Sequence, residues 1–307
     1  MHYTLHQLQV FLKVTQALSV TKAAEELNLT QPAVSIQLKN FQDQFEIPLT
    51  EIVGRKLYVT DFGAEIAIAA ENIINEVYAI NYKTLAFKGQ LSGRLKLSIV
   101  STGKYVMPYY LSKFLKTNNT IELEMDVTNK SKVITALKNN EVDFALVSVV
   151  PKDLEILSEE LLENKLYLFG NSEVEYNSPI DFSNLISTTS FIFREEGSAT
   201  RLATENYISK SKISPKTNMQ LTSNEAVKQA VLAGLGISIM PLIGLKNELE
   251  NGKIKIIDTK GLPILTSWRI IWLKGKKLSP VAAAFLNYIK EEKNTIRENQ
   301  FTWINNY

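Results

Sequence analysis

The sequence predicts an α/β protein with an N-terminal winged helix-turn-helix, a long linker helix and a two-lobed α/β domain. Apolar residues recur at helical spacing up to Phe41, a second helical pattern starts at Asp61, and strand and helix patterns alternate from Arg94 onward. A chain of 307 residues exceeds one typical domain. We therefore expect three segments, with the bounds 1–60, 61–90 and 91–307.

Composition argues against most enzyme classes. The chain has no cysteine, and its two histidines lie at positions 2 and 6. Disulfides and thiolate zinc sites are therefore excluded, and a Ser-His-Asp triad or an imidazole-rich metal site is hard to assemble. We expect no metal, no cofactor and no catalytic site.

Charge and hydropathy indicate which kinds of binding partner the chain can have. Lys and Arg total 34 against 32 for Asp and Glu, so nucleic-acid binding would depend on where cations lie rather than on their number. There is no signal-peptide pattern and no apolar run long enough to cross a bilayer. We expect a cytoplasmic protein with no membrane partner.

The first segment has a helix-turn-helix pattern. One helix should end near Ala17, Ser19 should cap a second, and Thr30 should cap a third that buries Val34 and Leu38. In such a motif the last helix lies in the major groove of DNA, where a Gln side chain can pair with adenine. A solvated polar face is the competing interpretation. The candidate DNA-binding residues of these helices are Ser19, Thr21, Lys22, Thr30, Gln31, Pro32, Ser35, Gln37 and Lys39.

A hairpin after Pro48 favours the DNA-binding interpretation. The stretch LTEIVGRKLYVT is typical of two short strands around a turn at Gly54. This wing would hold Arg55 and Lys56 beside a phosphate backbone.

The second segment is a predicted helix with an apolar stripe. Its members recur at spacings of four and three and are Ile66, Ala70, Ile73, Val77 and Ile80. Only about three heptads are present, so packing within the chain competes with a dimer seam between chains. The stretch KGQLSG, residues 88–93, is the expected hinge.

The third segment alternates strands and helices in two sets. The strand patterns RLKLSIV, IELEMDV and DFALVSV predict a doubly wound parallel sheet, in which ligands bind at the carboxyl ends of strands. The stretches KLYLFG, SFIFREEGSATR and SWRIIWL belong to a second set. Two lobes with a cleft between them are expected.

Hydroxyls and helix starts at predicted strand ends form a candidate ligand cradle. Gly197 lets the backbone turn, and helix N-termini attract anions. Taken singly, each residue is more often an ordinary helix cap than a ligand contact, but four such caps near predicted strand ends favour a binding site. Because few charges are obvious, we expect a small anion held by N–H and O–H groups. The candidate residues are Ser101, Thr102, Ser148, Gly197, Ser198, Ser223 and Asn224.

Several stretches, in order, resemble LysR-type transcriptional regulators. FLKVTQALSVTKAAEELNLTQPAVSIQLKNFQDQFEIPL and LYVTDFGAEI resemble the family's winged helix-turn-helix, while SIVSTGKYVMPYYLSKFL and AVLAGLGISIMP are similar to its effector domain, which resembles periplasmic binding proteins. The resemblance implies a dimer or tetramer on double-stranded operator DNA, joined by the linker helix, with an effector between the lobes and contacts to the transcription machinery. The form GSATR is similar to regulators of carbon dioxide fixation and sulfur assimilation, which respond to small anions.

The chain departs from this family at two positions that customarily carry arginine. Ile36 follows the recognition Ser, and Ile52 stands in the wing. The departures suggest an altered sequence preference. A solute-binding protein of the periplasmic type is the alternative function, and the missing signal peptide disfavours it.

Overall fold

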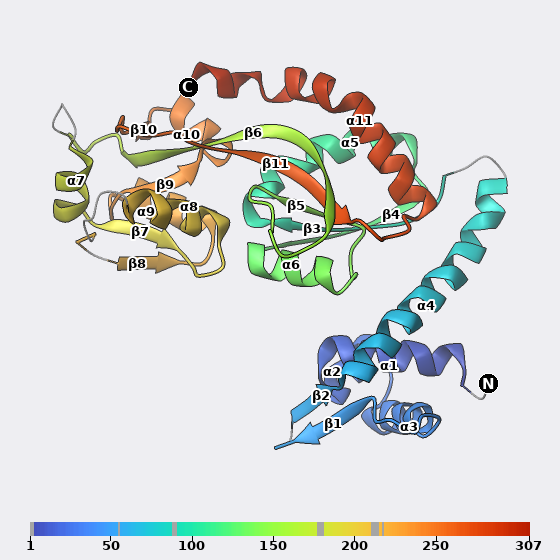
Figure 1. Cartoon of the computed structure of the whole chain (residues 1–307). Coiled ribbons are helices and arrows are strands. Elements are labelled where there is room, and N and C mark those ends of the chain that lie inside the picture. Colours follow the sequence, from blue (N-terminus) through green and yellow to red (C-terminus); the bar gives the residue numbers. More distant parts are fainter. Residues whose placement is uncertain (1–2, 55, 88–90, 177–180, 210–214, 217) are drawn as a thin grey trace. The chain divides into compact units, whose positions relative to one another are not determined.

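The computed structural model describes residues 3–54, 56–87, 91–176, 181–209, 215–216 and 218–307. Contacts divide the chain into two compact units, Met1–Gly93 and Arg94–Tyr307, whose elements are labelled in Figure 1. Two sequence predictions fall partly outside the described residues, because Arg55 of the wing and positions 88–90 of the hinge are not among them.

Three short helices open the first unit. They are α1 (Leu5–Ala17), α2 (Val20–Leu27) and α3 (Gln31–Gln42). The side chains of Ser19 and Thr30 accept hydrogen bonds from backbone N–H groups at the starts of α2 and α3, which satisfies donors that a helix leaves unpaired. Asn28 follows α2 in the left-handed conformation (φ 54°) and turns the chain into α3. The predicted helix-turn-helix is confirmed.

One face of α3 is buried against α1. Val34 and Phe41 of α3 lie in one core with Phe11 and Val14 of α1. The Phe11 and Phe41 rings have centroids 5.0 Å apart. Burying each large apolar side chain contributes roughly 1.5–3 kcal/mol, so this face is strongly preferred and the opposite face of α3 must point to solvent.

The wing is an antiparallel hairpin of β1 (Thr50–Val53) and β2 (Lys56–Val59). Thr50 pairs with Val59 at its base and Val53 with Lys56 at its tip. Gly54 has a φ of 57°, which few other residues adopt readily, and so suits the turn. The two predicted strands are confirmed.

Helix α4 (Asp61–Phe87) begins inside the core of the first unit and then leaves it. Ile66 packs against that core and Ala70 is buried in it, whereas 41% of Ile73 and 60% of Ile80 are exposed. Val77 is half-buried. The predicted seam is therefore corrected at Ala70, since this side chain is already buried in the core of the first unit and has no surface left for a partner.

The second unit contains one long mixed sheet and a two-stranded sheet. The long sheet has the order β10-β6-β11-β5-β3-β4, with β9 also paired to β6, and β7 pairs with β8. The strands of the two sheets together are β3 (Gly93–Val100), β4 (Ile121–Thr128), β5 (Phe144–Val147), β6 (Ile156–Asn171), β7 (Phe191–Arg194), β8 (Asn218–Leu221), β9 (Ser238–Pro241), β10 (Ile254–Ile256) and β11 (Ile264–Leu273).

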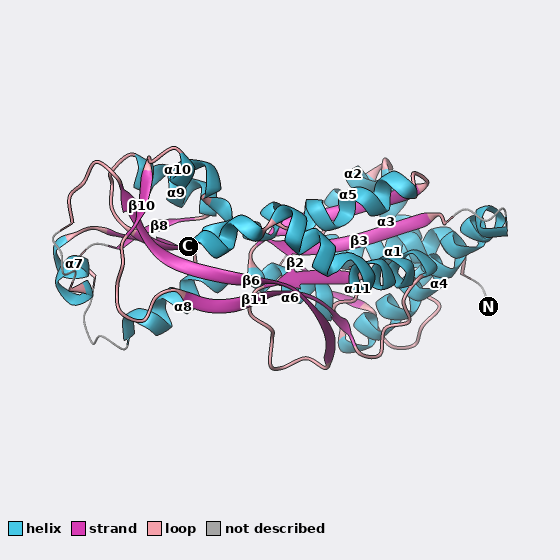
Figure 2. Cartoon of the chain, turned by 90° about the horizontal axis from the view of Figure 1, so that it is seen from above, coloured by secondary structure: helices cyan, strands magenta, loops and turns pink. Residues whose placement is uncertain are grey.

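Helices cover these sheets in two lobes (Figures 1 and 2). Around β3, β4 and β5 lie η1 (Ser101–Tyr105), α5 (Met107–Thr117), α6 (Lys130–Lys138) and α11 (Pro280–Gln300). The second lobe holds α7 (Phe182–Thr188), α8 (Ala199–Ile208), α9 (Asn224–Leu232), η3 (Leu242–Gly244) and α10 (Lys246–Glu250), and η4 (Thr302–Asn306) follows α11. The expected two-lobed α/β architecture is confirmed.

The expectation of a parallel sheet was wrong in one respect. β3 and β5 are parallel, but β6 runs antiparallel to β11, β9 and β10. β6 pairs with β11 from Ile156 to Leu166 and with β9 from Leu166 to Phe169, so a single strand passes from one lobe into the other (Figure 2). Two long strands that cross between lobes in opposite directions must pair antiparallel.

No helix in the described part of the chain is both long and apolar enough to cross a membrane.

Candidate recognition helix and effector pocket

Helix α3 presents a mixed polar and apolar face to solvent. Gln31, Pro32 and Lys39 are exposed, and Ser35 and Gln37 are half-buried on the flanks of the helix. The Gln31 side-chain amide donates a hydrogen bond of 3.0 Å to Ser35 Oγ. One N–H and the carbonyl oxygen of Gln31 stay available, which is the donor and acceptor pair that an adenine edge requires.

Ile36 also lies on this outer face, with 58% of its surface exposed. It is the large aliphatic side chain that α3 leaves in water, since Val34 and Leu38 are buried. From the sequence, Ile36 was notable only as a departure from a family pattern. The structure shows that this departure places an aliphatic side chain on the exposed face of α3.

The remaining DNA-binding candidates surround α3. Ser19 and Thr30 act as helix caps, and Thr21 is exposed at the start of α2. Three exposed cations, Lys22, Lys39 and Lys56, form no ion pair with any described residue, whereas Lys13 pairs with Glu26 at 3.0 Å. Unpaired exposed cations are suited to phosphate contacts.

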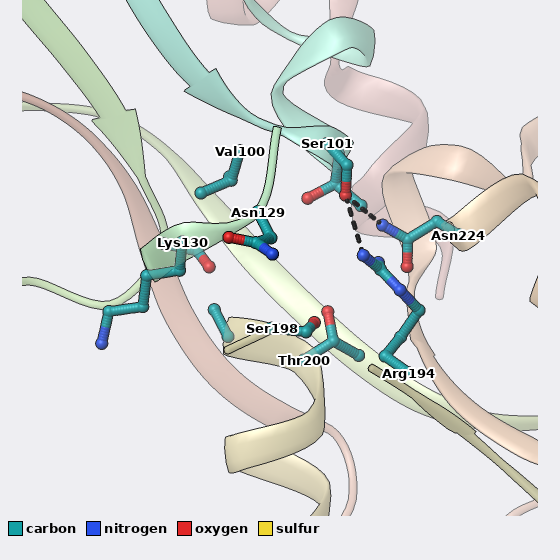
Figure 3. A pocket seen from close by; sticks show the side chains of 11 residues that line it. Val100, Ser101, Asn129, Lys130, Arg194, Ser198, Thr200 and Asn224 are labelled. Atoms are coloured by element: carbon teal, nitrogen blue, oxygen red, sulfur yellow. Dashed lines mark hydrogen bonds between the residues drawn. The ribbon is translucent and has the colours of Figure 1, made fainter. Parts of the chain in front are cut away.

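A pocket in the second unit lies between the two lobes (Figure 3). Its walls are Val100, Ser101, Thr102, Asn129, Lys130, Ser148, Arg194, Ser198, Ala199, Thr200 and Asn224. It is small and partly open to solvent.

Three helices begin at the wall of this pocket. Asn129 caps α6, Ser198 caps α8, and Asn224 is the first residue of α9. Each helix start carries N–H groups without intrahelical partners and the positive end of the helix dipole. Their convergence on one pocket favours an anionic ligand.

A buried arginine at the pocket wall is paired with a carboxylate. The Arg194 side chain is 3% exposed, and its Nε and Nη2 donate to the two carboxylate oxygens of Glu195 at 2.7 and 2.8 Å. Ser101 Oγ accepts bonds from Arg194 Nη2 at 3.3 Å and from Asn224 Nδ2 at 3.1 Å, drawn in Figure 3. This network joins both lobes, because Ser101 follows β3 while Arg194 ends β7.

Two further polar groups of the pocket are Asn224 Oδ1 and the Lys130 ammonium. Asn224 Oδ1 is buried and accepts no hydrogen bond from the described residues. Burial lowers the pKa of Lys130 although Asp153 acts in the opposite sense. In Figure 3 the Lys130 ammonium leads away from Ser101 and Arg194, so Arg194 is the cation nearest the centre.

Five of the seven predicted ligand residues line the pocket. They are Ser101, Thr102, Ser148, Ser198 and Asn224. The other two lie beside it: Ser223 caps α9 through a bond from Ala226 N of 3.0 Å, and Gly197 (φ 82°) precedes the Ser198 cap. Sequence reasoning missed Arg194 and Asn129, and its expectation of few charges was wrong at Arg194, which stands within the quoted stretch FREEGSATR.

Next to the pocket, an ionic network ties η1 to the second lobe. Tyr105 OH donates to Glu225 at 3.3 Å, and Lys228 Nζ pairs with Glu225 at 3.0 Å and with Glu248 at 2.9 Å. Burial would lower the pKa of Lys228, but hydrogen bonds to Glu248 and Glu225 outweigh it and raise the pKa. The network stabilises the lobes in the arrangement that encloses the pocket.

Comparison with known proteins identifies both units. Residues 5–64 match the bacterial regulatory helix-turn-helix proteins of the lysR family, and residues 88–294 match the LysR substrate binding domain. The chain belongs to the LysR family. It is a DNA-binding transcriptional regulator whose LysR substrate binding domain contains the pocket, as its resemblance to LysR-type regulators implied.

Relatives of this LysR-family chain match it over nearly its full length. It is 36% identical to the transcriptional activator CmpR of Synechocystis, over 93% of this chain and 94% of CmpR. It is 35% identical to the RuBisCO operon transcriptional regulator of Allochromatium vinosum, over 95% and 97%. The CcmR regulatory domain of Synechocystis in complex with 2-PG matches with 31% identity and a TM-score of 0.62, over 66% of this chain and 98% of that domain.

A solved full-length structure supports the fold alone. OxyR of Pseudomonas aeruginosa is 19% identical, with a TM-score of 0.67 over 97% of this chain and 95% of that chain.

Proposed function

We propose that this chain regulates genes of carbon dioxide fixation or inorganic carbon supply in response to a small phosphorylated carboxylic acid. The effector lies in the pocket between the lobes, where the helix starts and Arg194 bind its phosphate. Hydroxyls of Ser101, Thr102 and Ser198 donate to the remaining oxygens, with Asn224 and Ser148 completing the wall.

The convergence of three helix N-termini with a buried arginine carries this proposal. An anion in that position accepts hydrogen bonds from uncapped N–H groups and from the guanidinium, which are the groups proteins use for phosphate. Arg194 Nη1 has no acceptor among the described residues, so it is free to bind a ligand oxygen.

Relatives support the same class of effector. The regulators CmpR and those of RuBisCO operons are similar to the whole chain, and the matching CcmR regulatory domain was solved with 2-PG. We take 2-phosphoglycolate as the test ligand, since it combines a phosphate ester with a carboxylate.

The other parts of the proposal concern assembly and location. The protein is a cytoplasmic regulator and not an enzyme, and it acts as a homodimer or tetramer on operator DNA together with the transcription machinery. Exposed positions Ile73 and Ile80 of α4 support self-association. The periplasmic solute-binding alternative is disfavoured, because a solute-binding protein needs no helix-turn-helix.

Substitution of Ser198 by Asp tests the pocket. Asp is a good helix cap, so α8 should be retained, while its carboxylate repels an anion bound at the start of the helix. In calorimetric titration of the full chain with 2-phosphoglycolate, we expect Ser198→Asp to weaken binding at least tenfold, about 1.4 kcal/mol.

Ser279→Asp is the matched control, because Ser279 caps α11, which does not reach the pocket wall. It should leave the affinity within about twofold. Equal affinity of Ser198→Asp and the unmodified chain would reject the site, and no binding of 2-phosphoglycolate by the unmodified chain would reject the effector.

A further inference from the structure

The outer face of α3 has an apolar centre. Val34 and Leu38 mark the buried face, and Ile36 stands two residues from each of them. At 3.6 residues per turn this places Ile36 about 200° from Val34, in the middle of the exposed side. Pro32 and Lys39, one turn before and one turn after, lie on the same side and are exposed.

Scattered exposed aliphatic side chains need no special explanation in a soluble protein. Ile36 differs through its position, because α3 is the second helix of the helix-turn-helix and its outer face enters the major groove. A side chain at the centre of that face meets base edges, whereas flanking residues such as Lys39 lie nearer to phosphates.

The apolar side chain of Ile36 determines which base it can contact favourably in the major groove. Its hydrocarbon side chain has no hydrogen-bond donor or acceptor, so it gains nothing from the polar edges of guanine, cytosine or adenine and would desolvate them. Thymine alone presents an apolar group in the major groove, the C5-methyl. We propose that Ile36 is a specificity-determining residue that recognises a thymine in each operator half-site by contact with this methyl group.

The neighbouring side chains are compatible with this contact. Gln31 lies more than one turn before Ile36 and is oriented by its bond to Ser35, so it can reach a different base pair. The inference rests on DNA binding by the helix-turn-helix and goes beyond it by assigning one base and one atom group.

Replacing thymine by deoxyuridine tests the proposal, since it removes the C5-methyl and leaves base pairing intact. The full chain is first used to select its preferred duplex from a random-sequence library, and each thymine of that duplex is then replaced singly by deoxyuridine. We expect one thymine per half-site whose replacement weakens binding about fourfold, equivalent to roughly 0.8 kcal/mol for one buried methyl-sized group.

The variant Ile36→Ala should bind the thymine and deoxyuridine duplexes with equal affinity at that position. Leu235→Ala is the control, because Leu235 is 53% exposed but belongs to the second unit, and it should keep the fourfold penalty. The circular dichroism of Ile36→Ala should be unchanged, since the side chain is outside the core.

Two results would overturn the assignment of Ile36. One is equal binding of thymine and deoxyuridine duplexes by the unmodified chain, and the other is a penalty that persists in Ile36→Ala, which would give the methyl contact to another residue. Failure to bind any duplex in the library would instead reject DNA binding itself, and this inference with it.

Discussion

The guanidinium of Arg194 is neutralised by Glu195 on one edge and open on the other. Nε and Nη2 hold the carboxylate, while Nη1 has no acceptor in the described part of the chain. At the proposed site, an effector anion would compete with Glu195 for the charge of Arg194. We therefore expect the affinity for the anion to depend on this residue pair as well as on the helix starts around it.

The Glu195→Gln variant separates these contributions. Gln keeps one oxygen as an acceptor but removes the charge, so a buried arginine stays partly unpaired and the free energy of unfolding without ligand should fall by about 1–3 kcal/mol. The affinity for 2-phosphoglycolate should rise by about 1 kcal/mol or more, roughly fivefold, because the pair now has a net positive charge. Thermal melts and calorimetry measure the two effects.

Glu205→Gln is the matched control for this prediction. Glu205 pairs with Arg201 at 2.7 Å, but its side chain is 47% exposed, and surface pairs contribute little. Neither stability nor anion affinity should change appreciably. Weaker anion binding in Glu195→Gln would show that Glu195 orients Arg194 rather than competing with the ligand.

Helix α4 buries some of its apolar residues and exposes others. Ala70 and Ile74 complete the core of the first unit, whereas Ile73, beside Ile74 in the sequence, and Ile80, further along the helix, are exposed. The sequence predicted one continuous stripe because spacing alone does not reveal where the chain's own helices stop covering it. The stripe divides into a folding part and a part that is free to meet a second chain.

Charge substitutions along α4 should therefore have different effects. Ala70→Glu buries a charge and should unfold the first unit, whereas Ile80→Glu should shift the protein toward monomers with little loss of thermal stability. Ile68→Glu is the control, since Ile68 is 49% exposed on the opposite side of the helix and should alter neither property. Sedimentation velocity and thermal melts distinguish these cases. An unchanged oligomer in Ile80→Glu would remove this end of α4 from the interface.

At the scale of the whole molecule, local patterns predicted most of the elements but not all of their connections. Caps such as Ser19 and Thr30 are short-range features, so the helix-turn-helix followed from the sequence directly. The long strand β6 did not, because its first five residues, 156–160, are exposed or half-buried, and only KLYLFG is typical of a buried strand. Arg194 was missed for a similar reason, since only the folded chain brings it to Ser101.

The two lobes lie close together at Gly197. A Cβ atom built there would lie 2.6 Å from Ser131 Oγ of α6 in the first lobe, and the residue has a φ of 82°. Gly197→Ala should therefore hold the lobes apart and weaken 2-phosphoglycolate binding about tenfold or more, because the anion contacts groups from both lobes. Calorimetry on the full chain measures this loss.

Gly234→Ala separates the close approach from backbone strain. Gly234 has a similar φ of 73°, but a Cβ there meets only Asn171 Nδ2 at 3.9 Å. Both variants should lose about 1 kcal/mol of stability from the left-handed backbone, and only Gly197→Ala should lose anion affinity. Adding Ser131→Ala to Gly197→Ala removes the nearest atom and should restore much of the binding. Equal affinities in the two single variants would mean that the effector is bound without this approach of the lobes, and that regulation does not pass through their closure.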